Sequence, residues 1–309
     1  MSQRRTFLLM AGLSFTLAGC GDRAPQPEDT GAGLDCAEGW LADRGACVPE
    51  ACGTGPWGDL EVDDATVYVD IEAAEGGDGS ATAPLRSIQA GLDLAGLGGS
   101  DLVAVAAGSY PETLALTDDH AGVHLAGRCR ALVTLDASVG GEGTPGIDLD
   151  VHYGEIEVSG LRVTSAPRFG VRVGSGSVRL ADLWIDASGD AGVGAYRGTA
   201  SAPCELVVDA CELVGNTAVG LEVRGSSTEV RADNTGIRDT RPDDNGDYGY
   251  GVQVAGDAAP ELVCCELPGT TAARVLPTDP GSAASPAHAA LRATRSHAPA
   301  PCGSPVHCP

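Results

Sequence analysis

The feature that most restricts the fold of this sequence is a repeat in the middle of the chain. A glycine, an apolar residue, any residue and a second apolar residue follow one another in five copies, whose starts are 24, 22, 28 and 31 residues apart. The copies are at 146–149, 170–173, 192–195, 220–223 and 251–254. A short unit that recurs at such intervals is typical of chains that stack one structural unit on the next.

A second pattern follows each of the first four copies. Apolar residues alternate with others, skip two positions and alternate again, at 156–163, 178–185, 206–213 and 230–237. Period-two alternation indicates β-strands, and the two-residue step indicates a corner between short strands whose apolar side chains face one interior. Helical repeats would need apolar residues at about 3.6-residue spacing. In an antiparallel sandwich, the equivalent apolar positions of successive copies would not lie side by side. The pattern predicts an all-β solenoid of parallel strands.

A stretch before the repeats carries a family resemblance. The sequence reads D-G-S at 78–80, A-P-L-R-S-I-Q-A at 83–90 and V-A-V-A-A-G-S-Y-P-E at 103–112. This run, within 66–135, is similar to the N-terminal segment of right-handed parallel β-helix proteins of the pectate-lyase-like superfamily. The resemblance implies a right-handed parallel β-helix over 66–267, with a short helix that caps its first coil and closes an exposed strand edge.

The N-terminus is typical of an export signal. Arg4 and Arg5 precede an apolar stretch at 7–18 that is too short to span a bilayer. The sequence Leu-Ala-Gly-Cys at 17–20 resembles the lipobox of bacterial lipoproteins, which implies a signal peptide over 1–19 and lipidation of Cys20. Residues 4–8 also resemble the twin-arginine export motif. The alternative is an uncleaved apolar N-terminus. We expect a cell-envelope protein held in a membrane by lipid, periplasmic or at the outer-membrane surface.

Residues 20–35 are polar and rich in proline and glycine, as expected of a flexible tether. Residues 36–65 form a cysteine-containing segment ahead of the solenoid. Three cysteines of this segment, Cys36, Cys47 and Cys52, are candidates for disulfide bonds, and Cys129 is the fourth candidate. Export favours disulfide bonds between them, and their pairing is left open. Zinc is the competing interpretation, but no Cys-x2-Cys unit and no nearby histidine supports it.

The repeat pattern stops near residue 267. Residues 268–309 contain eight prolines, three arginines and one acidic residue, without strand periodicity. Such a segment cannot bury a core, so we expect a disordered tail. A truncated or frameshifted gene end is one explanation, and a genuine flexible tail is the other.

Charge excludes several functions. The 309-residue chain has 43 acidic and 19 basic side chains, and every basic one is arginine. The absence of lysine excludes Schiff-base chemistry and a phosphate-loop lysine. A net charge of −24 argues against nucleic acid and anionic lipid as partners. No spacing predicts a metal site, and no cofactor is expected.

The strand register predicts which side chains face outward on the last strand of each coil. One column reads Arg162, Trp184, Glu212 and Gly236, and the other reads Thr164, Asp186, Val214 and Arg238. We expect Trp184 to be an exposed platform for a sugar ring, with Arg162, Asp186 and Glu212 as the other binding residues. The alternative is that a loop from the 28-residue interval covers it.

Two function classes follow from this face. We favour non-catalytic binding of a polysaccharide or a partner. The alternative is a polysaccharide lyase or glycoside hydrolase, with Asp186 and Glu212 as weak catalytic candidates. Their backbones are about 8 Å apart by strand geometry, within the range for inverting glycosidases. The arginine and calcium sites of pectate lyases have no matching residues here.

Overall fold

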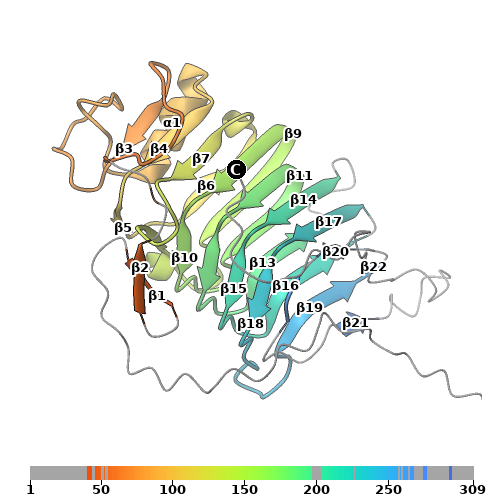
Figure 1. Ribbon diagram of the computed structural model, residues 1–309. Helices are drawn as coiled ribbons and strands as arrows, with labels where there is room; N and C mark the ends of the chain where they lie inside the picture. The colour runs from red at the N-terminus through yellow and green to blue at the C-terminus, as the bar shows by residue number, and fades with distance from the viewer. Residues whose placement is uncertain are drawn as a thin grey trace, which may run out of the picture. The chain divides into compact units, whose positions relative to one another are not determined.

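Figure 1 shows a computed structural model of the chain. It describes residues 40–43, 46–49, 52, 55–196, 203–225, 227–256, 258, 260–263, 265–267, 274–276 and 292–293. The chain divides into two compact units, Met1–Pro49 and Glu50–Pro309. In the first unit the strands β1 (Trp40–Asp43) and β2 (Ala46–Pro49) pair antiparallel. The predicted signal peptide, Cys20, the tether and Cys36 lie outside the described residues.

The second unit consists of parallel strands in three stacks (Figure 1). The first stack contains β3 (Val67–Val69), β4 (Leu102–Val105), β7 (His124–Gly127), the second halves of β9 (Ile147–Ser159) and β11 (Val171–Ala181), β14 (Cys204–Asp209), β17 (Thr228–Asp233), β20 (Glu261–Val263) and β22 (Arg292–Ala293). The second contains β6 (Leu114–Leu116), the first halves of β9 and β11, β13 (Ala191–Tyr196), β16 (Val219–Arg224), β19 (Tyr250–Ala255) and β21 (Arg274–Leu276). The third contains β5 (Gly108–Tyr110), β8 (Val133–Asp136), β10 (Arg162–Thr164), β12 (Trp184–Asp186), β15 (Glu212–Val214) and β18 (Gly236–Arg238).

The chain visits the second, first and third stacks in turn, and then begins the next coil. β13, β14 and β15 form one such coil, and β16, β17 and β18 form the next. The parallel strands from β3 to β20 fall within 66–267. The predicted all-β class and the predicted parallel pairing are confirmed.

The interior is the apolar column that the repeat predicts. Val158, Leu180, Val208 and Ala232 follow one another in register on the first stack, and all four are fully buried. Equivalent positions on the other stacks add valine, isoleucine, leucine and alanine side chains to the same core. Slim side chains suit this architecture, because neighbouring coils lie only about 4.8 Å apart.

The two-residue step in the repeat is a tight corner. Gly160, Asp182, Ala210 and Asn234 occupy equivalent positions after the first-stack strands, and each has a φ between 48° and 65°. Left-handed backbone costs a residue with a side chain about 1–2 kcal/mol, so only the surrounding strand pairing holds three of these residues there.

The predicted helix is present as α1 (Ile88–Gly98), which packs against β3 and β4. Ser87 caps it by accepting a hydrogen bond from the Ala90 amide. Glu112 accepts hydrogen bonds from the Ile88 and Gln89 amides at 2.7 and 3.1 Å. These bonds satisfy N–H groups that a helix start leaves without partners.

Two short 3-10 helices, η1 (Asp118–His120) and η2 (Ala137–Val139), interrupt the early coils. No helix among the described residues has the length and apolar character that a membrane crossing requires.

One of the expected disulfides joins Cys52 to Cys129. Cys47 lies in β2, and its side chain is outside the described part of the molecule. Cys211 occupies a fully buried position, as its place in the repeat predicts.

Two short strands lie beyond residue 267, where the repeat pattern stops. β21 continues the second stack beside β19, and β22 continues the first beside β20, both parallel. Sequence periodicity misses them because each is too short, at three and two residues, to show alternation. The remaining residues of 268–309 lie outside the described part of the chain.

Candidate functional site

The third stack brings the predicted outward residues together. Arg162, Trp184, Glu212 and Gly236 pair in register, and so do Thr164, Asp186, Val214 and Arg238. Alternate residues of a strand point to opposite faces, and the residues between these columns are buried in the core. We call the group of Arg162, Trp184, Asp186, Glu212 and Arg238 the tryptophan face.

Arg162 organises one half of this face. Its Nε donates to Asp186 Oδ1 at 2.9 Å and its Nη2 donates to Oδ2 at 2.5 Å. The guanidinium carbon also lies 5.4 Å from the centroid of the Trp184 ring, a cation–π contact. The hydrogen bond to Asp186 raises the pKa of Arg162 above its usual value. A planar two-pronged bond of this kind fixes the position of both groups.

The exposure predicted for Trp184 requires correction. The side chain is half-buried, and its Nε1 is buried without a hydrogen-bond partner among the described residues. Arg162 is one reason, because it reaches diagonally across the neighbouring strand over the ring to Asp186. Only part of the ring surface is therefore accessible to a ligand, next to the ion pair of Arg162 and Asp186. The ring is not the open platform that the sequence predicts.

Glu212 turns away from Asp186. A Cβ built on Gly236 would lie only 2.6 Å from Glu212 Oε2, so the carboxylate lies over the next strand. There it accepts a hydrogen bond from Arg238 Nε at 3.2 Å. Each candidate acid is thus held by its own arginine. This arrangement places two ion pairs around a half-buried indole and suits the binding of a polar, ring-shaped ligand.

A second polar cluster, which the sequence analysis did not predict, lies on the outer side of the second stack. Glu222 is only 2% exposed and accepts hydrogen bonds from Arg224 and from the Tyr196 hydroxyl. Gln253 Nε2 donates to it at 3.1 Å. Burial, followed by the charge of Glu222, raises the pKa of Tyr196. Glu222 occupies the variable position of the glycine repeat, for which the pattern predicts an ordinary solvent-facing side chain.

Room for this cluster comes from a glycine. A Cβ on Gly194, the register neighbour of Glu222, would lie 2.5 Å from the Tyr196 ring and 3.2 Å from Phe169. The two rings therefore cover the Gly194 backbone, with their centroids 5.3 Å apart. A glycine in the middle of a strand often marks such a close approach, and this was the one signal in the sequence.

Among the described residues no group of three or more histidine, cysteine or acidic side chains is arranged to hold a metal ion. Cys204 and Cys211 are buried free thiols, and burial raises the pKa of each to about 12. Neither is a reactive nucleophile, because the thiolate is the attacking form.

The stacked parallel strands and the apolar interior define the class of this protein as a parallel β-helix. No protein-family model matches the sequence, and no curated protein is significantly similar to it. One solved structure with a similar fold is tailspike protein gp49 of Acinetobacter baumannii bacteriophage Fri1, a capsular polysaccharide depolymerase. The identity is 12% and the TM-score is 0.41, over 70% of this chain and 48% of the tailspike. The chain thus spans about half the length of that protein, and the likeness carries no argument about function.

Proposed function

We propose that this protein is a lipid-anchored envelope protein whose parallel β-helix binds polysaccharide, without turnover, through the tryptophan face. One observation carries the proposal: Arg162 pairs with Asp186 while it lies over Trp184. An indole offers apolar surface to the C–H face of a sugar. A guanidinium and a carboxylate beside it offer donors and acceptors for hydroxyl groups.

The ion pairs support binding over catalysis. The two carboxyl groups of a glycosidase must flank the same bond. Here both carboxylate oxygens of Asp186 accept hydrogen bonds from Arg162. Glu212 lies over Gly236, toward Arg238. The two carboxylates are occupied as partners of arginine and do not converge.

The chain organisation in this proposal follows the sequence. Residues 1–19 are a signal peptide, lipid on Cys20 holds the protein in the membrane, and 20–35 separate the folded part from it. Residues 36–65 lead into a β-helix whose first coil is capped by α1. The helix is right-handed, as crossovers between parallel strands nearly always are. Replacement of Cys20 by alanine should move the protein from the membrane fraction to the soluble fraction; retention in the membrane would contradict the anchor.

The binding proposal is tested with the purified chain lacking residues 1–20 and a panel of soluble polysaccharides, in which affinity and the release of new chain ends are both measured. We expect binding without new chain ends. Trp184→Ala and Arg162→Ala should each weaken binding about tenfold, because each removes a contact of the order of 1.4 kcal/mol.

Arg179→Ala is the matched control, because Arg179 is also a half-buried arginine, paired with Asp209 at 2.6 Å on the first stack. It should leave affinity unchanged. Equal losses in Arg162→Ala and Arg179→Ala would refute the assignment to the tryptophan face. New chain ends that disappear in Asp186→Asn would establish the alternative, a lyase or hydrolase.

A further inference from the structure

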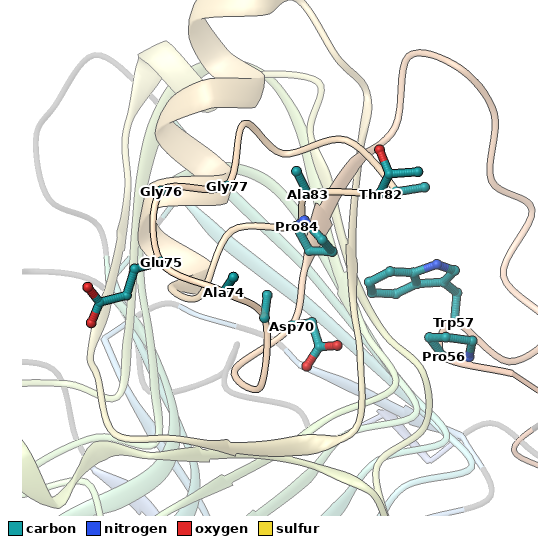
Figure 2. Close-up of a pocket in the computed structure, with 12 residues that line it drawn as sticks. Pro56, Trp57, Asp70, Ala74, Glu75, Gly76, Gly77, Thr82, Ala83 and Pro84 are labelled. Atoms are coloured by element: carbon teal, nitrogen blue, oxygen red, sulfur yellow. The ribbon is translucent and has the colours of Figure 1, made fainter.

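A pocket of about 360 Å³, lined by none of the tryptophan-face residues, lies between the segment around Trp57 and the turns that follow β3 (Figure 2). Its volume is near the lower end of the range of about 300–1,000 Å³ that is usual for small-ligand sites. We call it the Trp57 pocket; it is lined by Pro56, Trp57, Asp70, Thr82 and Pro84 together with small residues of the two turns. Figure 2 shows Pro84 beside the Trp57 ring and the Asp70 carboxylate below them, and all three line the same pocket.

The disulfide fixes the wall that carries Trp57. Cys52 is bonded to Cys129, and its carbonyl oxygen accepts a hydrogen bond from Arg128 Nε at 3.3 Å. A Cβ on Gly58 would lie 2.4 Å from the same carbonyl oxygen, so the backbone next to Trp57 packs directly on Cys52. The Trp57 ring is half-buried, with its centroid 4.9 Å from that of Tyr68.

Backbone hydrogen bonds fix the opposite wall. The Asp70 amide donates to Leu85 O at 2.7 Å, and the Asp78 amide donates to Ala83 O at 2.9 Å. A Cβ on Gly77 would lie 2.0 Å from Pro84 O, which shows how closely the two turns approach. Both walls are therefore set by the fold, so a ligand would not have to order them.

The polar group in the pocket is an acceptor. Asp70 Oδ1 accepts a hydrogen bond from the Glu72 amide at 2.9 Å, and Oδ2 has no hydrogen-bond partner among the described residues. None of the described residues that line the pocket is basic. Glu75 also lines it, but its side chain is 93% exposed, pairs with Arg86 at 3.8 Å and points away from Trp57 (Figure 2). The negative charge of Asp70, which has no ion-pair partner among the described residues, disfavours an anionic ligand.

We propose that the Trp57 pocket is a second glycan-binding site, selective for sugars that carry no acidic group. A sugar ring stacks its C–H face on the indole and donates a hydroxyl proton to Asp70 Oδ2. This inference rests on the proposed function only in that the ligand is a glycan; the site, its residues and its selectivity are independent of the tryptophan face.

The test is titration calorimetry of the folded chain with dextran, laminarin and xyloglucan as uncharged probes and polygalacturonate as the acidic probe. We expect at least one uncharged probe to bind and polygalacturonate to bind at least tenfold more weakly. Trp57→Ala should weaken binding of the uncharged probe about tenfold. Asp70→Asn should weaken it several-fold and reduce the discrimination against polygalacturonate, because it removes a negative charge without changing the size of the side chain.

Two further variants separate this site from the tryptophan face. Trp57→Phe keeps an aromatic wall and should retain most of the affinity, so it serves if Trp57→Ala fails to fold. Loss of binding of an uncharged probe in Trp57→Ala but not in Trp184→Ala supports the Trp57 pocket and leaves the tryptophan face to be tested by its own panel of polysaccharides. The reverse result overturns this inference and leaves the proposed function standing. Absence of binding by every probe, or tighter binding of polygalacturonate, overturns the inference as well.

Discussion

Removal of the Cys52–Cys129 disulfide gives a prediction whose size follows from the structure. The bond joins residues 77 positions apart, so it closes a long loop in the unfolded chain. The chain-entropy relation gives a stabilisation of about 4.5 kcal/mol at 25 °C for a loop of this length. The double variant Cys52→Ala/Cys129→Ala should therefore be less stable by an amount approaching that value.

Urea unfolding followed by tryptophan fluorescence and far-UV circular dichroism measures the change. With a slope of about 3 kcal/mol per molar urea, the midpoint should fall by about 1.5 M. The slope should also rise, because the unfolded chain without the cross-link exposes more surface. Both single variants should match the double variant, since either one breaks the bond.

Cys204→Ala is the control, because Cys204 is a buried cysteine without a disulfide. This substitution removes packing contacts but no covalent bond, so it should lower the free energy of unfolding by about 1 kcal/mol. An unchanged midpoint in the double variant, or a fall no larger than in Cys204→Ala, would refute the reasoning. The double variant should also bind the uncharged probes of the Trp57 pocket more weakly, because Trp57 follows the cross-link closely in the chain.

Three further predictions concern single side chains. Asn216 is fully buried, donates to Ile185 O at 3.0 Å and accepts from the Ser188 amide at 3.1 Å. Asn216→Ala should lower the free energy of unfolding by about 2–4 kcal/mol in urea titrations, because two buried backbone groups lose their partners. A change below about 1 kcal/mol would contradict this. Glu112→Ala should destabilise the start of α1 by about 1–2 kcal/mol, seen as faster amide exchange at Ile88 and Gln89, and unchanged exchange there would argue against the cap. Burial lowers the pKa of His124 below its usual value of 6.5. The folded state therefore binds this proton less readily than the unfolded state, and the protein loses stability as pH falls through 6.5. His124→Gln should lose less stability than the wild type between about pH 7 and pH 5, and equal losses in the variant and the wild type would contradict the assignment.

Much of the fold could be predicted from the sequence because the relevant signal is local and repeated. Apolar alternation specifies a strand, the two-residue step specifies a corner, and repetition specifies parallel stacking. The columns through Trp184 and Asp186 followed from that register, and the structure has the same pairs. The short helix that the family resemblance implied is α1, which begins directly after Ser87.

The site was less predictable because side-chain partners depend on reach as well as register. Register places Arg162 beside Trp184, but only the three-dimensional structure shows the guanidinium extending over the ring to Asp186. Burial of Glu222 depends on the Tyr196 ring folding back over Gly194.

The sequence by itself determined that this chain stacks short parallel strands around a slim apolar interior, because period-two alternation and its repetition are properties of the chain. Only the tertiary structure decided which side chains meet. Trp57 and Asp70 lie on different segments, and one wall of their pocket is held by a bond between Cys52 and Cys129. Four cysteines left that pairing open, because a disulfide requires proximity in space, which sequence spacing does not encode.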